Sequence, residues 1–277
     1  MSCVLVTGAT GFVGRHIVRA LTDVGATVVA VVRDNHNPAR KCTLPADTSV
    51  VSTADLFAES AIWWERHCAN VDVIVHAAWY AEPGRYLQSP QNIDCLIGSL
   101  NLARGAASAG VRRFVGVGTC FEYNLTAGVL STDTPLNPLT LYASSKAALY
   151  LSLSHWLPWH AVQFAWCRLF YLHGEGEDER RLVPYLRKQL AQGQRADLSY
   201  GAQVRDFLDV QEAGRKIAAV ALGEREGPLN ICSGQGITVR ELALRIAAEY
   251  GRADLLNFGS LPDRLIDPPH IVGVPSF

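Results

Sequence analysis

Tyr142 and Lys146 are the residues whose types and spacing most directly suggest chemistry. They lie in the run Leu141-Tyr142-Ala143-Ser144-Ser145-Lys146, which opens a predicted helix that continues through about Ser154. Residues four apart share one face of a helix, so the two side chains can converge. A nearby ammonium stabilises a phenolate and lowers the pKa of the phenol, which is otherwise roughly 10. The pair therefore suits proton transfer to or from an alcohol or carbonyl oxygen.

The spacing of Tyr142 and Lys146 also occurs on ordinary helix surfaces, so the pair alone is weak evidence. Thr119 is the third group that we predict to act with it. It follows the predicted strand 113–118, and open α/β sheets bind ligands at the carboxyl ends of their strands. Its hydroxyl can hold a substrate oxygen beside Tyr142, while Lys146 can donate to a ribose hydroxyl. We therefore predict Thr119, Tyr142 and Lys146 as catalytic residues that move a proton while a nicotinamide exchanges hydride at carbon.

A glycine-rich turn near the N-terminus is expected to hold that nicotinamide cofactor. The run Thr7-Gly8-Ala9-Thr10-Gly11-Phe12-Val13-Gly14 follows the apolar Val4-Leu5-Val6 and opens a helical pattern. Glycines at this spacing permit a sharp turn, close approach of a pyrophosphate and close packing of the helix. The amino end of the helix then faces the phosphates. We predict a dinucleotide site with contacts from Gly8, Thr10, Gly11, Phe12, Val13 and Gly14.

The residue that ends the second predicted strand decides which dinucleotide is favoured. Strand 27–32 is followed by Arg33 and Asp34, about 20 residues past the glycine turn. An acid placed first would accept from ribose hydroxyls and repel a 2′-phosphate, whereas a guanidinium can clamp that phosphate. Arg33 therefore favours NADP(H). NAD(H) remains possible, because Arg33 can be a solvated charge while Asp34 turns inward.

Two further strand ends are predicted to contact the cofactor. Asp55-Leu56 follows a short strand, and the Asp55 carboxylate can accept from the adenine amino group, cap the next helix, or do both. Another apolar strand leads into Ala77-Ala78-Trp79, where small residues leave room for a flat ligand. His76 lies within that strand and is expected to be a hydrogen-bonded core residue. The loop from Trp79 to Pro90 is predicted to face the substrate.

Capping patterns predict several helix starts. Asp209 with Glu212 and the box Thr238-Val239-Arg240-Glu241 each indicate an amino end. Longer helices are predicted over 92–109 and 182–192. After Tyr250 the pattern weakens, because four prolines interrupt any long helix.

The composition limits the protein class. The 277 residues suffice for one domain with a small lobe, and 49% apolar against 18% charged residues indicates a packed core. A net charge of −1 argues against nucleic acid as a main partner. Seven cysteines without metal-site spacing are expected to be reduced thiols in a cytoplasmic protein, with no metal. No apolar run has the length of a membrane span, so no membrane association is expected.

Together these motifs resemble the extended short-chain dehydrogenases/reductases, in particular the NAD(P)-dependent nucleotide-sugar epimerase, dehydratase and reductase group. The similarity extends to about Gly236. The glycine turn resembles the family's TGxxGxxG, Asp55-Leu56 its adenine-side pair, and His76-Ala77-Ala78 its HxA strand end. Further matches are Thr119, Tyr142 and Lys146 with its Ser/Thr–Tyr–Lys set, Arg168-Leu169-Phe170-Tyr171 and His173-Gly174 with RxFNxxGP, and Arg205-Asp206-Phe207 and Asp209-Val210 with RDFxxVxD.

The resemblance implies an α/β fold, with a doubly wound parallel Rossmann sheet and a small C-terminal substrate-binding lobe. Residues 1–170 would form the NAD(P)-binding Rossmann domain with 205–235 packing back on it, and 171–204 and 236–277 the lobe. It also implies a homodimer through a helix bundle and a nucleotide-diphosphate sugar substrate. The substrate contacts would be Thr119, Cys120, Tyr171 and Arg205. Arg205 can pair with the diphosphate, or instead with Asp206 or Asp209.

Departures from the family pattern narrow the expected reaction. The family's 4,6-dehydratases place Asp-Glu directly after the catalytic Thr, where this chain has Cys120-Phe121, and a phenyl ring cannot transfer protons. Enzymes like GDP-fucose synthase place an acid Cys two residues after their Ser, whereas Cys120 is one residue on. Tyr171 replaces the Asn of RxFN. Dehydration and coupled 3,5-epimerisation are therefore not expected.

What remains is NADPH-dependent reduction of a keto group, at C4, on a nucleotide-linked deoxysugar, with the proton from Tyr142. The run Gly118-Thr119-Cys120-Phe121-Glu122-Tyr123 also resembles deoxysugar ketoreductases of the CDP-abequose synthase type. One alternative is an NAD-dependent 4-epimerase that retains its cofactor. A second is a non-catalytic dinucleotide-binding regulatory protein, against which the retained catalytic set argues.

Overall fold

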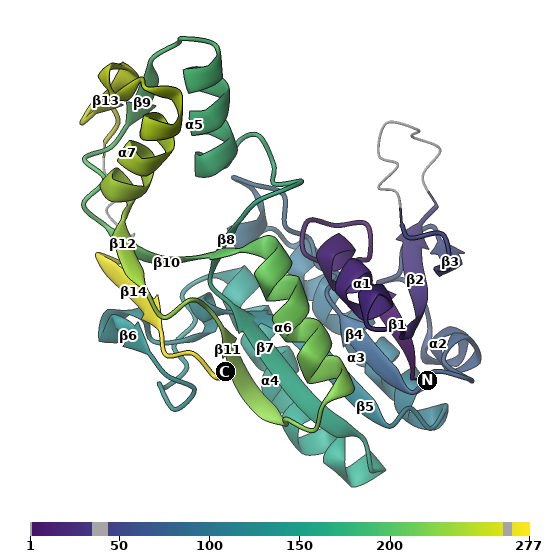
Figure 1. Ribbon diagram of the computed structural model, residues 1–277. Helices are drawn as coiled ribbons and strands as arrows, with labels where there is room; N and C mark the ends of the chain where they lie inside the picture. The colour runs from purple at the N-terminus through teal and green to yellow at the C-terminus, as the bar shows by residue number, and fades with distance from the viewer. Residues whose placement is uncertain (1, 35–43, 263–267) are drawn as a thin grey trace.

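The computed structural model describes residues 2–34, 44–262 and 268–277, which form a large lobe around a sheet and a smaller lobe above it (Figure 1). The sheet has seven parallel strands in the order β11-β7-β5-β4-β1-β2-β3. Their bounds are β1 Cys3–Thr7, β2 Thr27–Arg33, β3 Ser49–Thr53, β4 Val73–His76, β5 Arg113–Thr119, β7 Gln163–Leu169 and β11 Gly227–Ile231. The predicted doubly wound sheet is confirmed.

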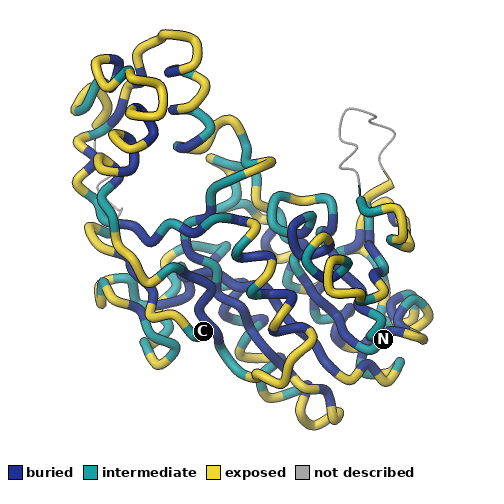
Figure 2. Tube along the Cα trace, in the orientation of Figure 1, coloured by how far each residue is buried: buried dark blue, intermediate teal, exposed yellow. Residues whose placement is uncertain are grey.

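Helices cover both faces of this sheet, which explains why its strands are nearly continuous apolar runs. One face packs against α1 (Gly14–Asp23) and α6 (Val210–Leu222). The other packs against α2 (Ala61–His67), α3 (Gln91–Ser108) and α4 (Leu141–Trp156). Figure 2 shows the strands buried between these two layers. The parallel strands all end at the same edge, so the residues that follow them are brought together there.

The smaller lobe has a core of its own. It contains α5 (Leu182–Ala191), α7 (Val239–Tyr250), β9 (Ala196–Leu198) and β13 (Leu256–Phe258). Leucine and isoleucine side chains of α5 and α7 meet at the centre, including Leu186, Leu190, Leu242 and Ile246. The pattern after Tyr250 gave no indication of β13, a strand of three residues that pairs with β9.

A second sheet joins the lobes. Its strands are β12 (Gly236–Thr238), β10 (Val204–Asp209), β14 (His270–Gly273) and β6 (Val129–Leu130), and β8 (Tyr171–His173) pairs with β10. Strands β8 and β10 lie side by side where the large lobe meets the small one (Figure 1). They therefore carry residues of the RxFN-like and RDF-like segments to the space between the lobes.

The capping predictions are confirmed, with one correction. Asp209 caps α6, and Thr238 with Glu241 forms a capping box on α7. The predicted helices 92–109 and 182–192 correspond to α3 and α5. The expectation that Asp55 might cap α2 is wrong, because Ser60 accepts the Trp63 N–H there. The Asp55 carboxylate instead accepts the Phe57 N–H at 3.0 Å, in a turn before the helix.

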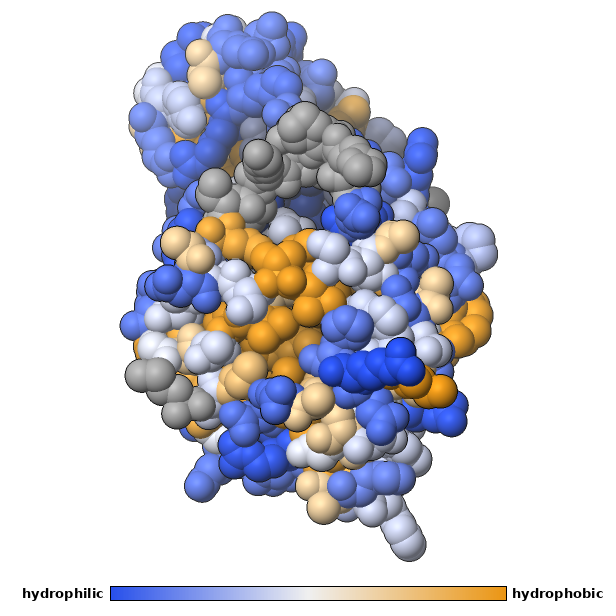
Figure 3. All heavy atoms as spheres, turned by 90° about the vertical axis from the view of Figure 1, so that its right-hand side faces the viewer, coloured by the Kyte–Doolittle hydropathy of each residue, from blue (hydrophilic) through white to orange (hydrophobic). Residues whose placement is uncertain are grey.

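The face on the side of β3 and α2 is partly apolar. Figure 3 shows hydrophobic atoms in the middle of this face, among hydrophilic ones. Exposed apolar side chains of this region include Val50 of β3 and Ile62 of α2. In the described part of the chain, no helix combines the length and apolar character that crossing a membrane requires.

Candidate active site

The glycine turn has the geometry that a dinucleotide pyrophosphate requires. Gly8 adopts φ +69°, and a Cβ there would lie 2.7 Å from the Ala78 nitrogen at the exit of β4. A Cβ on Gly14 would overlap the Gly8 carbonyl oxygen. Helix α1 starts at Gly14, and no side chain of the described residues caps it. The Arg15 and His16 N–H groups bond to the carbonyls of Gly11 and Val13, and the predicted contacts Thr10, Phe12 and Val13 lie in the turn that leads into the helix.

A neutral hydrogen-bond chain fixes the exit of β4 beside this turn. Ser99 Oγ donates to the Cys95 carbonyl at 2.6 Å, so it accepts from His76 Nε2 at 2.7 Å. His76 Nδ1 then accepts from Thr7 Oγ1 at 2.7 Å, and Thr7 accepts the Ala78 N–H. Burial lowers the pKa of His76 to about 3, so the ring is uncharged at neutral pH. The expected core role of His76 is confirmed.

Thr119 and Tyr142 are brought into contact. Thr140 caps α4 by accepting the Ala143 N–H at 3.1 Å, which places Tyr142 in the first turn. Thr119 at the end of β5 lies close enough to Tyr142 for its side chain to lower the pKa of the phenol against the rise that burial causes. The ring of Tyr86, in the loop predicted to face the substrate, stands edge-on to Tyr142 at 4.8 Å between centroids. The phenol thus lies at the sheet edge where β1 and β4 also end.

Lys146 lies one turn further along α4, and it does not affect Tyr142 in the expected way. Its Nζ donates to the Val117 carbonyl at 2.6 Å and lies 4.0 Å from the centre of a Trp79 ring. Burial raises the pKa of Tyr142, and the Thr119 side chain is what opposes this rise. The expectation of a lowered phenol pKa is therefore wrong for this arrangement. Burial lowers the pKa of Lys146 to about 8, while the charge of Glu122 raises it.

Arg33, the predicted 2′-phosphate contact, and Asp55, the predicted adenine contact, lie at or just after the ends of two neighbouring strands. Arg33 ends β2 and pairs in register with Thr53 of β3, two residues before Asp55. Arg33 and Asp55 are both exposed, whereas Leu56 packs into the core beneath them. Residues 35–43 lie outside the described part of the chain. The structure therefore places the proposed 2′-phosphate and adenine contacts at one end of the sheet.

The predicted substrate residues lie where β8 and β10 leave the large lobe. The ring of Tyr171 is 6.1 Å from that of Phe121, and the Arg205 guanidinium carbon is 5.4 Å from the Tyr171 ring. Arg205 is buried and donates to the Val204 carbonyl at 2.7 Å. Its two alternative partners have other roles, because Asp206 accepts from Ser233, Gly234 and Gly273, and Asp209 caps α6.

The predicted substrate contact Cys120 is buried, as Arg205 is. Its side chain packs in a cluster that includes Tyr123, Phe170 and Cys232. Burial raises its pKa, so it is a neutral thiol. Phe121, which follows it, is only partly buried and faces Tyr171. The side chain that faces the substrate region at this turn is therefore a phenyl ring.

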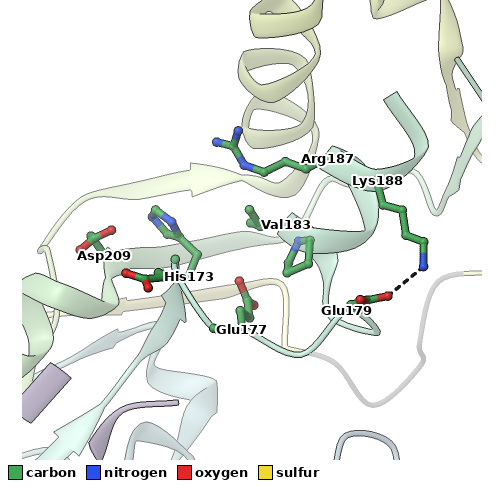
Figure 4. A pocket seen from close by; sticks show the side chains of 11 residues that line it. His173, Glu177, Glu179, Val183, Arg187, Lys188 and Asp209 are labelled. Atoms are coloured by element: carbon green, nitrogen blue, oxygen red, sulfur yellow. Dashed lines mark hydrogen bonds and ion pairs between the residues drawn. The ribbon is translucent and has the colours of Figure 1, made fainter. Parts of the chain in front are cut away.

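A cleft of about 760 Å³ lies along β8, the segment that follows it, and α5 (Figure 4). His173 and Glu177 line it from the β8–α5 segment, and Arg187 lines it from α5. Burial raises the pKa of Glu177 to about 7. The same segment contacts α1, because His16 Nε2 bonds with the Glu175 carbonyl at 3.0 Å. The residues that line this cleft do not include Thr119, Tyr142 or Lys146, so the predicted catalytic set lies outside it.

Sequence reasoning missed Glu122, which is fully buried behind Thr119. Its carboxylate accepts the Thr119 N–H and pairs with Arg168. The alternating Gly116 and Gly118 of β5 were the available signal, since glycine in a strand interior often marks a close approach. A Cβ at Gly118 would overlap both Trp166 and Glu122.

The family model of the NAD-dependent epimerase/dehydratase family matches residues 4–232 of this chain. The chain belongs to this family. The predicted membership in the extended short-chain dehydrogenase/reductase group is confirmed, as is the assignment as an NAD(P)-dependent enzyme of that type.

Individual relatives differ in the reactions they are named for. The dTDP-6-deoxy-L-talose 4-dehydrogenase (NAD(+)) of Aggregatibacter actinomycetemcomitans is 23% identical over 98% of both chains. The CDP-abequose synthase of Salmonella typhimurium is 24% identical, over 94% of this chain and 86% of the relative. The solved UDP-N-acetylglucosamine 4-epimerase of Methanobrevibacter ruminantium M1 superposes with a TM-score of 0.84 at 23% identity, covering 99% of this chain and 90% of that one. This last likeness shows the fold.

Proposed function

We propose that this protein reduces a keto group, at C4, of a nucleotide-linked deoxysugar with NADPH, and that Tyr142 supplies the proton. The observation that carries the proposal is the placement of Tyr142 beside Thr119, with Lys146 bonded to the Val117 carbonyl of β5, at the edge of the sheet where the glycine turn also lies. Bound NADPH would supply hydride to the carbonyl carbon. Thr119 would orient the carbonyl oxygen, and Tyr142 would protonate it. Lys146 would contact the nicotinamide ribose.

The side chains around this set favour simple reduction over dehydration. Expulsion of water would need an acid and a base beside the sugar, where the chain offers Cys120 and Phe121. The first is a buried neutral thiol and the second a phenyl ring. Reduction needs one proton at oxygen, which Tyr142 can supply. A relative named as a dTDP-6-deoxy-L-talose 4-dehydrogenase and one named as CDP-abequose synthase support a deoxysugar substrate.

The substrate would lie between the lobes, with its diphosphate held by Arg205 beside Tyr171. In this proposal residues 1–170 and 205–235 form the cofactor-binding domain, and 171–204 and 236–277 the substrate lobe. NADPH is proposed over NADH because an exposed guanidinium, Arg33, ends β2 where the adenosine ribose would lie. Asp55, Leu56 and the Ala77-Ala78-Trp79 exit would complete the cofactor contacts.

We further propose a cytoplasmic homodimer in which α3 and α4 pack against a second copy. The outer surface of these helices exposes Ile93, Ile97 and Leu151 at 43%, 54% and 50%. The first two are four residues apart and so lie on one face of α3. Sedimentation velocity at several concentrations should give the mass of a dimer. A monomer at all concentrations would remove this part of the proposal.

The direct test is reduction of a panel of CDP-, dTDP-, UDP- and GDP-linked 4-keto-6-deoxysugars, followed by NADPH or NADH absorbance. We expect turnover of at least one 4-keto sugar, with NADPH preferred. Turnover of none, with normal NADPH binding, would contradict the proposal and favour a non-catalytic binding protein.

The competing function is NAD-dependent 4-epimerisation, which relatives named as UDP-glucose 4-epimerases represent. The same Thr119, Tyr142 and Lys146 would serve both directions of hydride transfer. An epimerase would be purified with tightly held NAD and would need no added cofactor. Cofactor content after acid release therefore separates the two functions.

A further inference from the structure

Glu122 stands out as a buried carboxylate to which the expected mechanism gives no role. It ends the short 3₁₀ helix η3 (Cys120–Glu122), which begins directly after Thr119. Glu122 is 0% exposed and Arg168 of β7 is 1% exposed, and Glu122 Oε2 accepts from Arg168 Nε at 2.7 Å. A buried charge pair of this kind requires good geometry and further hydrogen bonds to offset its desolvation.

Further donors complete the carboxylate's environment. Glu122 Oε1 accepts the Thr119 N–H at 2.8 Å, and Trp166 Nε1 lies 3.1 and 3.0 Å from the two carboxylate oxygens. Thr119 in turn accepts the Phe121 N–H through its hydroxyl. The backbone position of Thr119, and hence the direction of its hydroxyl, is therefore tied to Glu122.

Strand β5 is shaped to admit this carboxylate. A Cβ on Gly116 would overlap the Trp166 ring, and a Cβ on Gly118 would overlap Trp166 Nε1 and Glu122 Oε1. Both glycines are in an extended strand, so space rather than backbone angle requires them. The two glycines thus make the room in which Trp166 and Glu122 meet.

Arg168 connects the same carboxylate to helix α4. Its guanidinium carbon lies 4.5 Å from the Tyr123 ring and 4.6 Å from the ring of Tyr150. Tyr150 is on α4, four residues after Lys146, and so shares the helix face that carries Tyr142 and Lys146. Arg168 Nη1 also donates to the Tyr123 hydroxyl at 3.0 Å. Glu122 and Arg168 together therefore hold the end of β5 against the helix that carries the phenol.

We propose that Glu122 is a positioning residue, which fixes Thr119 relative to Tyr142 and supplies the negative charge that keeps the buried Lys146 an ammonium. Lys146 Nζ donates to the Val117 carbonyl of β5 and lies 5.9 Å from the centre of a ring of Trp166, the residue whose Nε1 bonds to Glu122. At this separation the carboxylate favours the charged form of Lys146. The positioning of a catalytic residue rests on the proposed function, whereas the charge relation to Lys146 can be measured without a substrate.

The charge relation is tested by lysine-selective ¹³C NMR, because the chain has only four lysines, at 41, 146, 188 and 216. The Lys146 signal is identified by its loss in Lys146→Arg. In Glu122→Gln we expect the titration midpoint of Lys146 to fall by about one pH unit, a tenfold change in its acid constant. The control is Arg113→Gln, which removes an equally buried charge at the other end of β5, where it bonds to the Val220 carbonyl.

Turnover gives the second readout. We expect Glu122→Gln to bind NADPH normally, to lose about tenfold or more in kcat at pH 7.5, and to regain part of this at lower pH, where Lys146 is protonated. A merely structural role would lower kcat equally at all pH values. If Glu122→Gln does not fold, Glu122→Gln/Arg168→Gln, which removes both charges, is measured in its place.

If Glu122→Gln has the same Lys146 titration midpoint and the same pH profile of kcat as the control Arg113→Gln, Glu122 does not have the proposed role. The proposed reaction would be unaffected by that result. A wild-type protein that reduces no keto sugar would overturn the proposed reaction, and the Lys146 midpoint would still decide the role of Glu122.

Discussion

The two sides of the candidate site are held in place by different physical means. The glycine-turn side (residues 7–14 with the exit of β4 at 76–79) is fixed by close backbone packing and by an uncharged Thr7–His76–Ser99 chain. The tyrosine side (Thr119, Glu122 and Arg168 with α4) is fixed by a buried ion pair. The first side can hold a cofactor with little dependence on pH, whereas the second depends on charge. Binding and turnover should therefore respond to different substitutions.

The largest expected effect is on the tyrosine side. Tyr142→Phe removes the proton donor and should lower kcat about 10²- to 10⁴-fold, the usual contribution of a general acid. NADPH affinity, measured by fluorescence titration, should stay within about twofold, because the cofactor is held mainly by the glycine turn. Unchanged turnover in Tyr142→Phe would remove the acid role.

A pair of glycine substitutions tests the separation of the two sides. Gly14→Ala places a Cβ onto the Gly8 carbonyl, and Gly118→Ala places one onto Trp166 and Glu122. Overpacking costs about 1–3 kcal/mol, so we expect a roughly 10- to 100-fold effect in each. In Gly14→Ala this overpacking should weaken NADPH binding, whereas in Gly118→Ala it should lower kcat.

Gly25→Ala is a suitable control for this pair, because nothing lies within 4 Å of a Cβ at that site. It shows the effect of a Gly→Ala change without a clash, and because Gly25 has φ +80°, which Gly14 and Gly118 do not, it carries an added backbone cost. If both clashing variants lose cofactor binding and turnover to the same degree, the two sides are not independent.

A smaller and more selective effect is expected at Arg33. Arg33→Ala should weaken NADPH by about 10- to 100-fold, the value of lost charge-assisted hydrogen bonds to a phosphate. NADH affinity should hardly change, since NADH has no 2′-phosphate. Isothermal titration with both cofactors measures this, and an equal loss for both would show that Arg33 does not bind the 2′-phosphate.

The smallest effect concerns the pH dependence of stability on the glycine-turn side. The folded pKa of His76, about 3, lies below its unfolded value of 6.5, so its contribution to stability is complete above pH 6.5 and declines as the pH falls toward 3. Between pH 6.5 and 5.5 it should decline by about 1 kcal/mol. The free energy of unfolding of His76→Gln, measured with urea at several pH values, should lack this part of the pH dependence. A pH dependence equal to that of the wild type would show that His76 has the same pKa in the folded and unfolded protein, and would contradict its buried, neutral state.

The same contrast explains what the sequence could predict. Gly8 and Gly14 were interpretable because a turn between strand and helix has few other solutions, and Thr119, Tyr142 and Lys146 because strand ends and helix spacing are local features. Glu122 was not assigned, since its partners Trp166 and Arg168 lie on a strand more than 40 residues away. The direction of the Tyr142 pKa was wrong because burial cannot be read from spacing.

The small lobe was the least predictable region. Strand β13 has three residues and pairs with β9, about sixty residues earlier, so neither strand shows a period of its own. Its helices α5 and α7 were predicted, since each carries an apolar face and α7 has a complete capping box. Local signals thus located the helices, and tertiary pairing alone determined the short strands.

The central claim is that Thr119, Tyr142 and Lys146 meet around the reactive face of a nicotinamide ring held by the glycine turn. A crystal structure with NADP⁺ and a nucleoside diphosphate tests it most directly. We expect a pyrophosphate on the Gly8–Gly14 turn, Lys146 on the nicotinamide ribose, and the Tyr142 hydroxyl next to Thr119 beside the ring. A dinucleotide bound with Tyr142 directed away from the nicotinamide would contradict it.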